Sequence, residues 1–221
     1  MASGKLNLYA NVEYNRPRFT FDYENFNIIC DSLDSFRYVL VRDPQPGYEP
    51  TPLERALSKT VFENVTGTIH IDDPQNKSGK ESNPQYPVFD SYASSYLYWD
   101  KPSIQGGVYS KEQFYFSVDP FVLDSLENFD DQGLKFGGEF FSSEIFPTFR
   151  QDLTVMPDFT LGFVEETPEE GYDVYDYQGK YTGKIFLDGT GLHGSGKLES
   201  IDAVMVSDSF SFHFDSVMAV I

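Results

Sequence analysis

Aromatic and polar residues alternate at three places along the chain, and this alternation predicts β-strands. Two phenylalanines separated by one residue occur in Phe19–Phe21, Phe114–Phe116 and Phe210–Phe212. Residues i and i+2 of a strand point to the same face of a sheet, so both rings of each pair are expected to face a core. The three copies begin 95 and 96 residues apart, which suggests an internal repeat.

A valine and a short polar break precede each copy. The valines are Val12, Val108 and Val204, and the breaks contain residues that favour turns. Each copy therefore predicts a strand, a tight turn and a second strand, and we expect the three copies to be equivalent parts of one core.

Glycine interrupts a second group of alternating strands. These strands are Val65–Ile71, Phe136–Phe141 and Tyr181–Leu187. Glycine inside a strand marks a bulge or a place where a large neighbouring side chain lies over the backbone. The chain has 21 Phe and 15 Tyr, so such neighbours are abundant.

A single helix is predicted between these strands. Thr51 fits the N-cap, Pro52 the first helical position and Glu54 the third, which together form a capping box for a helix over residues 52–59. The proline-containing segment Asp72–Asp90 that comes later is expected to be a long polar loop.

These patterns predict an all-β fold of repeat-built antiparallel sheet, either an elongated sheet, a sandwich or an open trough. The 221 residues are 40% hydrophobic and 17% aromatic, which suffices for a sizeable core. Strand-like sequence lies at both ends, Leu6–Tyr14 and Ser216–Ile221. We therefore expect residues 1–221 to form a single all-β unit that is a fragment of a larger repeat protein with a period of about 96 residues.

The chain is strongly acidic, with a formal charge of −19 and a pI near 4.3. Such a charge repels phosphate backbones and anionic lipid surfaces, so nucleic acid is not an expected partner. The charge also keeps an aromatic-rich β protein soluble. It therefore identifies no partner by itself.

Cys30 is the only cysteine and lies in an apolar run, where a buried side chain is expected. It cannot form an internal disulfide. No apolar segment approaches the ~20 residues that a membrane helix needs, so no transmembrane segment is predicted.

The segment Gly189–Gly194 matches G-x-G-x-x-G, a nucleotide-binding pattern. That pattern functions only where a helix begins directly after it, and the residues that follow are strand-like. We therefore expect a hairpin with Asp188 and Gly189 in its turn. Ser195 lacks the flanking glycines of a nucleophile elbow, and we predict no catalytic residues.

The histidines and the acidic loops contain the candidate metal ligands of the chain. His70, His193 and His213 are too far apart in sequence for metal-ligand spacing, so zinc is not predicted. Oxygen atoms of Asp72, Asp73 or Asp188 could hold calcium in an extracellular setting, although no EF-hand pattern is present. Calcium is the one cofactor that the sequence leaves open.

An aromatic cluster lies in the predicted strand from Tyr92 to Trp99. Tyr92, Tyr96 and Tyr98 share one face of that strand and Trp99 the other. If exposed, these rings would form a platform for sugars or for another protein. If buried, they are core, which we favour because a lone tryptophan in an all-β domain is usually packed.

The segment YTGKIFLDGTGLHGSGKLES, Tyr181–Ser200, repeats an apolar-x-Gly-x-apolar pattern. In this pattern the last 45 or so residues resemble the long β-repeat proteins of bacterial cell envelopes, the AsmA-like and lipid-bridge kind. The resemblance implies an open trough with an apolar interior that conducts lipid, a bacterial cell-envelope or extracellular location, and no enzymatic activity. The capped helix after Thr51 and the long proline loop depart from a uniform trough.

Two classes of function remain open on the sequence alone. The first is a non-enzymatic structural or interaction module of a large cell-envelope or secreted protein, with a protein or a lipid as partner. The second is a carbohydrate-binding or carbohydrate-cleaving β domain that uses the aromatic cluster and the acidic loop Glu165–Gly171, with a glycan as ligand.

Overall fold

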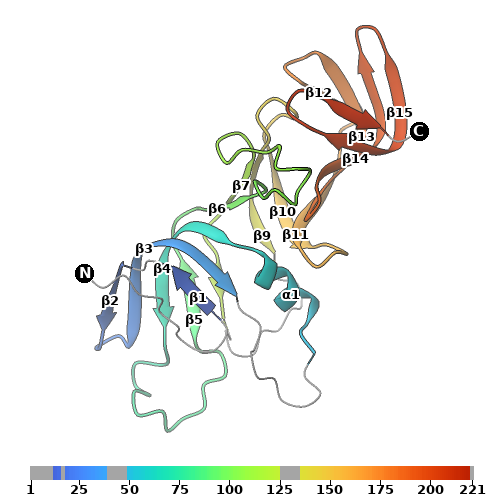
Figure 1. Ribbon diagram of the computed structural model, residues 1–221. Coiled ribbons are helices and arrows are strands. Elements are labelled where there is room, and N and C mark those ends of the chain that lie inside the picture. Colours follow the sequence, from blue (N-terminus) through green and yellow to red (C-terminus); the bar gives the residue numbers. More distant parts are fainter. Residues whose placement is uncertain (1–11, 16–17, 39–48, 125–134, 220–221) are drawn as a thin grey trace. The chain divides into compact units, whose positions relative to one another are not determined.

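The computed structural model describes residues 12–15, 18–38, 49–124 and 135–219, which form sixteen β-strands and one α-helix (Figure 1). The strand pairs are antiparallel, so the all-β fold predicted from the sequence is confirmed. The chain divides into two compact units. The first contains residues 1–97 and 118–136, and the second contains residues 98–117 and 137–221.

The first unit is built around the long strand β3. Strands β1 and β2 pair with β3 on one side and β4 on the other, and β5 pairs with β4 and β8. Its elements are β1 (Val12–Asn15), β2 (Arg18–Asp22), β3 (Asn27–Tyr38), α1 (Pro52–Lys59), β4 (Phe62–His70), β5 (Val88–Ser91) and β8 (Val122–Leu123). Three further strands contribute residues to both units: β6 (Ser95–Tyr98), β7 (Tyr115–Val118) and β9 (Phe136–Phe141).

The predicted helix is present with its predicted bounds. The Thr51 side chain accepts a hydrogen bond from the Glu54 amide, and the Glu54 carboxylate accepts one from the Thr51 amide, which completes the capping box. The buried side chains of α1 include Leu53 and Leu57, and α1 contacts β3. Cys30 of β3 is fully buried, as predicted.

The second unit is a meander in which β10, β11, β13, β14, β15 and β16 lie in that order, with β12 beside β13. Figure 1 shows β13, β14 and β15 as the long strands of this unit. Its elements are β10 (Phe149–Val155), β11 (Leu161–Glu166), β12 (Tyr172–Val174), β13 (Gly179–Asp188), β14 (Gly191–Ser200), β15 (Val204–Phe212) and β16 (Val217–Ala219). Packed aromatic rings fill its core, among them Phe114, Phe140, Phe163, Tyr181 and Phe212.

The three aromatic pairs are not equivalent. Phe114, Phe116, Phe210 and Phe212 are fully buried, as predicted. The expectation for the first pair is wrong, because Phe19 and Phe21 of β2 are 48% and 49% exposed. The alternation identifies residues that share a face, but it does not tell whether another element covers that face.

The polar breaks before the pairs do not form equivalent hairpins. Val108 lies outside any strand, between turns. Val204 and the Phe210–Phe212 pair belong to one continuous strand, so the predicted turn at Ser207-Asp208-Ser209 is wrong. Two residues of β15 oppose one residue of β14 there, which is a β-bulge. The Ser207 hydroxyl accepts a hydrogen bond from the Ser209 amide at 3.0 Å and donates one to the Ser209 carbonyl at 3.1 Å. The side chain thus closes the bulge.

Two of the three predicted strand glycines, Gly67 and Gly138, lie beneath aromatic rings. The prediction is wrong for Gly183, where a Cβ atom would meet the backbone of Ser195 and Gly196 and no ring. A Cβ atom on Gly67 would lie 2.9 Å from the Phe89 ring, and one on Gly138 would lie 2.5 Å from the Phe116 ring. On Gly194 it would meet the Tyr181 hydroxyl and lie 2.8 Å from the Phe212 ring. At Gly67 and Gly138 the backbone carbonyls of Asp90 and Ser117 lie closer still than the rings, so no larger side chain fits at either position.

The long loop after β4 is held by a network of amide and carboxylate groups. Asp72 accepts hydrogen bonds from the Asn76 and Asn83 side-chain amides, both at 2.7 Å. Asn76 is buried and also bonds the backbone of Glu81 in both directions. These bonds explain how a long segment without helix or strand keeps one conformation. In the described part of the chain, no helix is long and apolar enough to cross a membrane.

Candidate functional site

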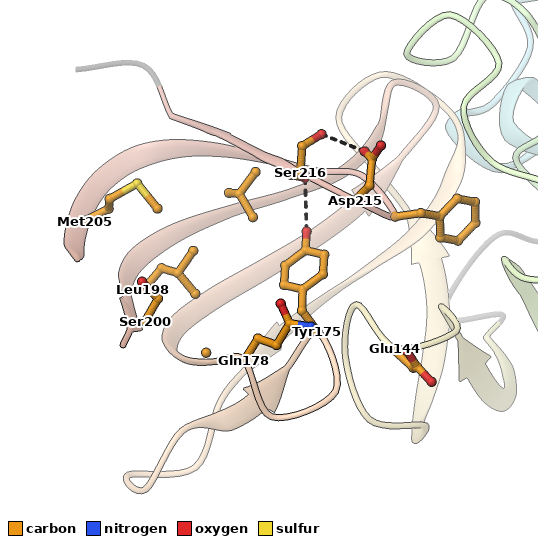
Figure 2. Close-up of a pocket in the computed structure, with 11 residues that line it drawn as sticks. Glu144, Tyr175, Gln178, Leu198, Ser200, Met205, Asp215 and Ser216 are labelled. Carbon is orange, nitrogen blue, oxygen red and sulfur yellow. Dashed lines mark hydrogen bonds between the residues drawn. The ribbon is translucent and has the colours of Figure 1, made fainter. Parts of the chain in front are cut away.

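A hollow of about 390 Å³ lies within the second unit, beside the ends of β13, β14 and β15 (Figure 2). Its floor is apolar and comes from Leu198 of β14, Met205 of β15 and Val217 of β16. Its rim is polar and includes Glu144, Gln178, Ser200, Asp215 and Ser216. The volume falls within the range of small-molecule sites, roughly 300–1,000 Å³.

Strand alternation explains the apolar floor. Leu198 and Met205 are opposite each other in the β14–β15 pair, so their side chains share one face of the sheet. The same face carries the buried rings of Phe210 and Phe212 further along β15. Gly179 of β13 has no side chain, and a Cβ atom there would lie 3.4 Å from a methyl group of Leu198. The apolar face of the sheet therefore continues from the core into the open hollow.

A strained turn forms one wall of the hollow. It joins β12 to β13 and contains three consecutive non-glycine residues in the left-handed conformation: Tyr175, Asp176 and Tyr177, with φ of 52°, 52° and 63°. This conformation is unfavourable for L-residues by about 1–2 kcal/mol each. It is held because the Tyr175 amide donates to the Glu144 carbonyl at 2.6 Å, and the Gln178 amide donates to the Tyr175 carbonyl at 3.1 Å.

The Tyr175 side chain ties this wall to the segment between β15 and β16. Its hydroxyl can donate to the His213 carbonyl at 2.9 Å or to the Ser216 carbonyl at 3.2 Å. Figure 2 shows the contact with Ser216. Burial raises the pKa of Tyr175 well above its usual value, so the hydroxyl keeps its proton and remains a donor even at alkaline pH. Ser216 also donates to the Asp215 carboxylate at 3.0 Å.

The arrangement suits an apolar group with polar contacts at its edge. Leu198, Met205 and Val217 offer hydrocarbon surface, while Glu144 and Asp215 place two exposed carboxylates at the rim. Burial of apolar surface would supply most of the binding energy. The carboxylates would disfavour an acidic ligand and favour a basic one.

A second hollow, of about 380 Å³, shares Glu144 and the strained turn with the first. Tyr177 is 81% exposed and lines it together with Tyr172. Glu170, of the acidic loop that the sequence singled out, also lines this hollow. A lysine, Lys180, pairs with the lining carboxylate of Asp173 at 2.9 Å.

The predicted aromatic cluster is not one strand. Tyr92 lies outside β6 and is 54% exposed, while Tyr96 and Tyr98 of β6 are half-buried. Trp99 is only 5% exposed, and its indole nitrogen donates to the Asp188 carbonyl at 2.9 Å. Trp99 is therefore core, the alternative that the sequence favours. Tyr92 and Tyr96 belong to the first unit, and Tyr98 and Trp99 to the second.

The aspartates considered for calcium organise loops. Asp72 accepts the amides of the long loop, and these hydrogen bonds hold its pKa below the usual value. The Asp73 carboxylate accepts a hydrogen bond from the backbone amide of Gln75 at 2.8 Å. Asp188, in the second unit, accepts from the amide and hydroxyl of Thr190. Within the described ranges, no group of three or more His, Cys, Asp or Glu side chains is placed to hold a metal ion.

The G-x-G-x-x-G segment forms the predicted hairpin. Asp188 pairs with Gly191, which leaves Gly189 and Thr190 as a two-residue turn, and β14 follows in place of a helix. His193 of this hairpin lies with its Nε2 atom 2.8 Å from the Thr190 hydroxyl and its Nδ1 atom 3.3 Å from the Ser211 hydroxyl. The three side chains form a polar row on the sheet surface.

In comparisons of the chain with protein-family models, curated proteins and solved structures, nothing matched. A function for this chain is therefore inferred from its fold and from the two hollows. Sequence reasoning missed Tyr175, Met205 and Val217 as members of one site, because they come from a turn and two strands that meet only in the folded unit.

Proposed function

We propose that the protein is a non-enzymatic structural or interaction module of a larger bacterial cell-envelope or secreted protein, and that its second unit is an apolar-lined β trough. The observation that supports this proposal most directly is the continuity of one sheet face. On that face the buried rings of Phe210 and Phe212 give way to Leu198, Met205 and Val217, which line the open hollow.

Contact between an open apolar face and water is unfavourable. Covering that face with another apolar group lowers the free energy. The module thus holds a preformed place for an apolar group of a partner or ligand. The location in the envelope or outside the cell rests on the resemblance of Tyr181–Ser200 to envelope β-repeat proteins.

Binding of Nile red, a neutral apolar dye, tests this role. The parent protein should enhance the fluorescence of the dye. Met205→Lys should remove that enhancement because it places a charge on the floor of the hollow. Val206→Lys is the matched control, since Val206 is the next residue of the same strand and is 72% exposed on the opposite face. Equal dye binding by the parent and Met205→Lys would contradict the proposal.

A second candidate is carbohydrate binding, which is supported by the second hollow and not by the Tyr92–Trp99 segment. Exposed Tyr177 and the neighbouring carboxylates combine an aromatic face with hydrogen-bond acceptors, the chemistry that holds sugar rings. On a glycan array, Tyr177→Ala should lose any bound glycan. Tyr23→Ala, which removes a 66% exposed tyrosine of the first unit, should retain it.

A further inference from the structure

The second hollow is built from two segments of the second unit, residues 143–147 and 168–177. The Tyr175 amide joins these segments by donating to the Glu144 carbonyl at 2.6 Å. Phe146, which lines the hollow, is only 1% exposed, and its ring packs edge-on against Tyr172 with the ring centroids 6.5 Å apart. The hollow is therefore held open by a packed part of the fold.

Flat apolar surfaces line this hollow. The side chain of Tyr177 is 81% exposed, and the exposed rings of Pro147 and Pro168 lie along the same hollow. An exposed aromatic face can pack against the C–H groups of a sugar ring and bury apolar surface on both sides. These rings account for the apolar part of a ligand, and the polar lining decides which ligand fits.

The polar side chains of the hollow are mostly acceptors of hydrogen bonds. The four carboxylates that line it are Glu144, Glu170, Asp173 and Asp176. An ionised carboxylate accepts hydrogen bonds and donates none. Among the described residues, no lysine, arginine, histidine, asparagine or glutamine lines the hollow. A ligand that fills it must therefore bring most of the donors.

The hydroxyl of Tyr172 adds little to the supply of donors. It already donates to the Glu165 carboxylate at 3.0 Å, and Glu165 does not line the hollow. Burial and the neighbouring Glu165 carboxylate raise the pKa of Tyr172 to about 12, so the hydroxyl keeps its proton and this hydrogen bond.

Three of the four carboxylates have no cationic partner. Lys180 pairs with Asp173 at 2.9 Å. In the part of the chain that the structure describes, no lysine or arginine pairs with Glu144, Glu170 or Asp176. The net charge of −19 adds a field of the same sign. The hollow therefore favours a ligand that carries a positive charge as well as donors.

We propose that the second hollow binds a sugar that carries a free amino group, with the sugar ring against Tyr177 and the ammonium group among the carboxylates. An ammonium group has three donors and no acceptor, which complements this lining. The inference rests on the second candidate function, carbohydrate binding, and names the class of sugar. It does not depend on the apolar role of the first hollow.

Isothermal titration calorimetry with two matched ligands tests the inference. Oligomers of glucosamine and of N-acetylglucosamine of equal length share the sugar ring, but the first carries ammonium groups and the second neutral acetamides. At low salt and about pH 6, where a sugar amine is protonated, the glucosamine oligomer should bind about tenfold more tightly. Raising NaCl to about 0.5 M should remove most of this preference.

A double variant tests the carboxylates. Glu170→Gln with Asp176→Asn removes two charges, and asparagine tolerates the left-handed conformation of Asp176 as aspartate does. Glucosamine binding should weaken about fivefold or more. The matched control is Glu166→Gln with Glu169→Gln, which makes the same change of net charge at two exposed residues that do not line the hollow. Its affinity should stay within about twofold of the parent.

The aromatic face is tested separately. Tyr177→Phe keeps the ring and should retain glucosamine binding, whereas Tyr177→Ala should lose it. Each variant must first show the unfolding midpoint of the parent, which is expected because the substituted residues are exposed.

Four outcomes would overturn the inference. Equal affinity for the two oligomers would overturn it and leave carbohydrate binding in place. Glucosamine binding that the double variant does not weaken would place the ligand elsewhere. A lysine-containing peptide that binds as tightly as the glucosamine oligomer would show that the hollow takes an amine without regard to the sugar. Binding of neither oligomer, with Nile red still bound, would overturn the carbohydrate candidate as well and leave the apolar role of the first hollow.

Discussion

Phenylalanines in the same sequence pattern contribute very unequally to stability. Phe116→Ala and Phe212→Ala each remove a fully buried ring and should destabilise the fold by about 3–5 kcal/mol. Phe21→Ala removes a ring that is half exposed and should destabilise it by less than about 1 kcal/mol. Chemical denaturation of the three variants measures both effects. Similar losses in all three would mean that the first pair also faces a core.

The burial of Cys30 should make the stability of the fold decrease as the pH rises above about 9. Burial raises the pKa of its thiol from 9.0 to about 11. The unfolded state releases the thiol proton above pH 9 while the folded state retains it, so the unfolded state is favoured as pH rises. The contribution of the neutral thiol is complete below pH 9 and is lost toward pH 11, a change of about 2–3 kcal/mol.

A comparison with Cys30→Ala isolates this effect from the ionisation of tyrosines. Denaturant midpoints are measured in steps between pH 8 and about 10.5, with a reducing agent present. The stability advantage of the parent over Cys30→Ala should shrink as pH rises. An advantage that stays constant would show that the thiol does not titrate differently in the two states.

At the scale of single elements, the capping box of α1 should be measurable. Thr51→Ala removes the acceptor for the Glu54 amide and should reduce stability by about 1 kcal/mol. Thr51→Ser keeps the hydroxyl and should stay within about 0.5 kcal/mol of the parent. Urea denaturation gives both values. If the serine variant is as unstable as the alanine variant, the methyl group of Thr51 and not its hydroxyl carries the effect.

Elements set by local chemistry could be predicted from the sequence, and those set by distant contacts could not. Helix α1 depends on Thr51, Pro52 and Glu54, which lie within one turn. The turn at Gly189 likewise depends on adjacent residues. The segment Ser207–Ser209 predicts a turn because serine and aspartate favour turns. It forms a bulge because β14 remains paired with β15 on both sides of the segment, and that pairing lies outside the local pattern.

At the scale of the whole molecule, self-repulsion of the net charge of −19 should lower stability at low salt. Raising the ionic strength from about 0.01 M to about 0.1 M shortens the Debye length from about 30 Å to about 10 Å. The thermal midpoint should rise by about 2–4 °C, equivalent to about 1 kcal/mol for a chain of this size.

Scanning calorimetry at two NaCl concentrations tests the salt effect. The control is the double variant Glu169→Lys and Glu170→Lys, whose residues are both exposed. This variant lowers the net negative charge and should respond less to salt than the parent. A midpoint that falls with salt would show that attractive ion pairs outweigh the repulsion.

The candidate site could not be predicted from the sequence because its residues are scattered between Glu144 and Val217. Alternation places Met205 on one strand face, but only the packed unit shows that this face stays open. The wall depends on Tyr175 in a left-handed turn, a conformation that tyrosine rarely adopts. The Glu144 carbonyl that accepts the hydrogen bond from Tyr175 lies 31 residues earlier in the chain. The residues near Tyr175 in the sequence therefore do not predict this turn.

The close packing around the strand glycines also constrains how this sequence can change over time. A Cβ atom on Gly138 would collide with the backbone carbonyl of Ser117, and one on Gly67 would lie 2.5 Å from the backbone carbonyl oxygen of Asp90. A smaller residue in place of the ring of Phe116 or Phe89 would leave these carbonyls where they are. Both positions should therefore remain glycine among descendants of this chain, even where the neighbouring aromatic residues change.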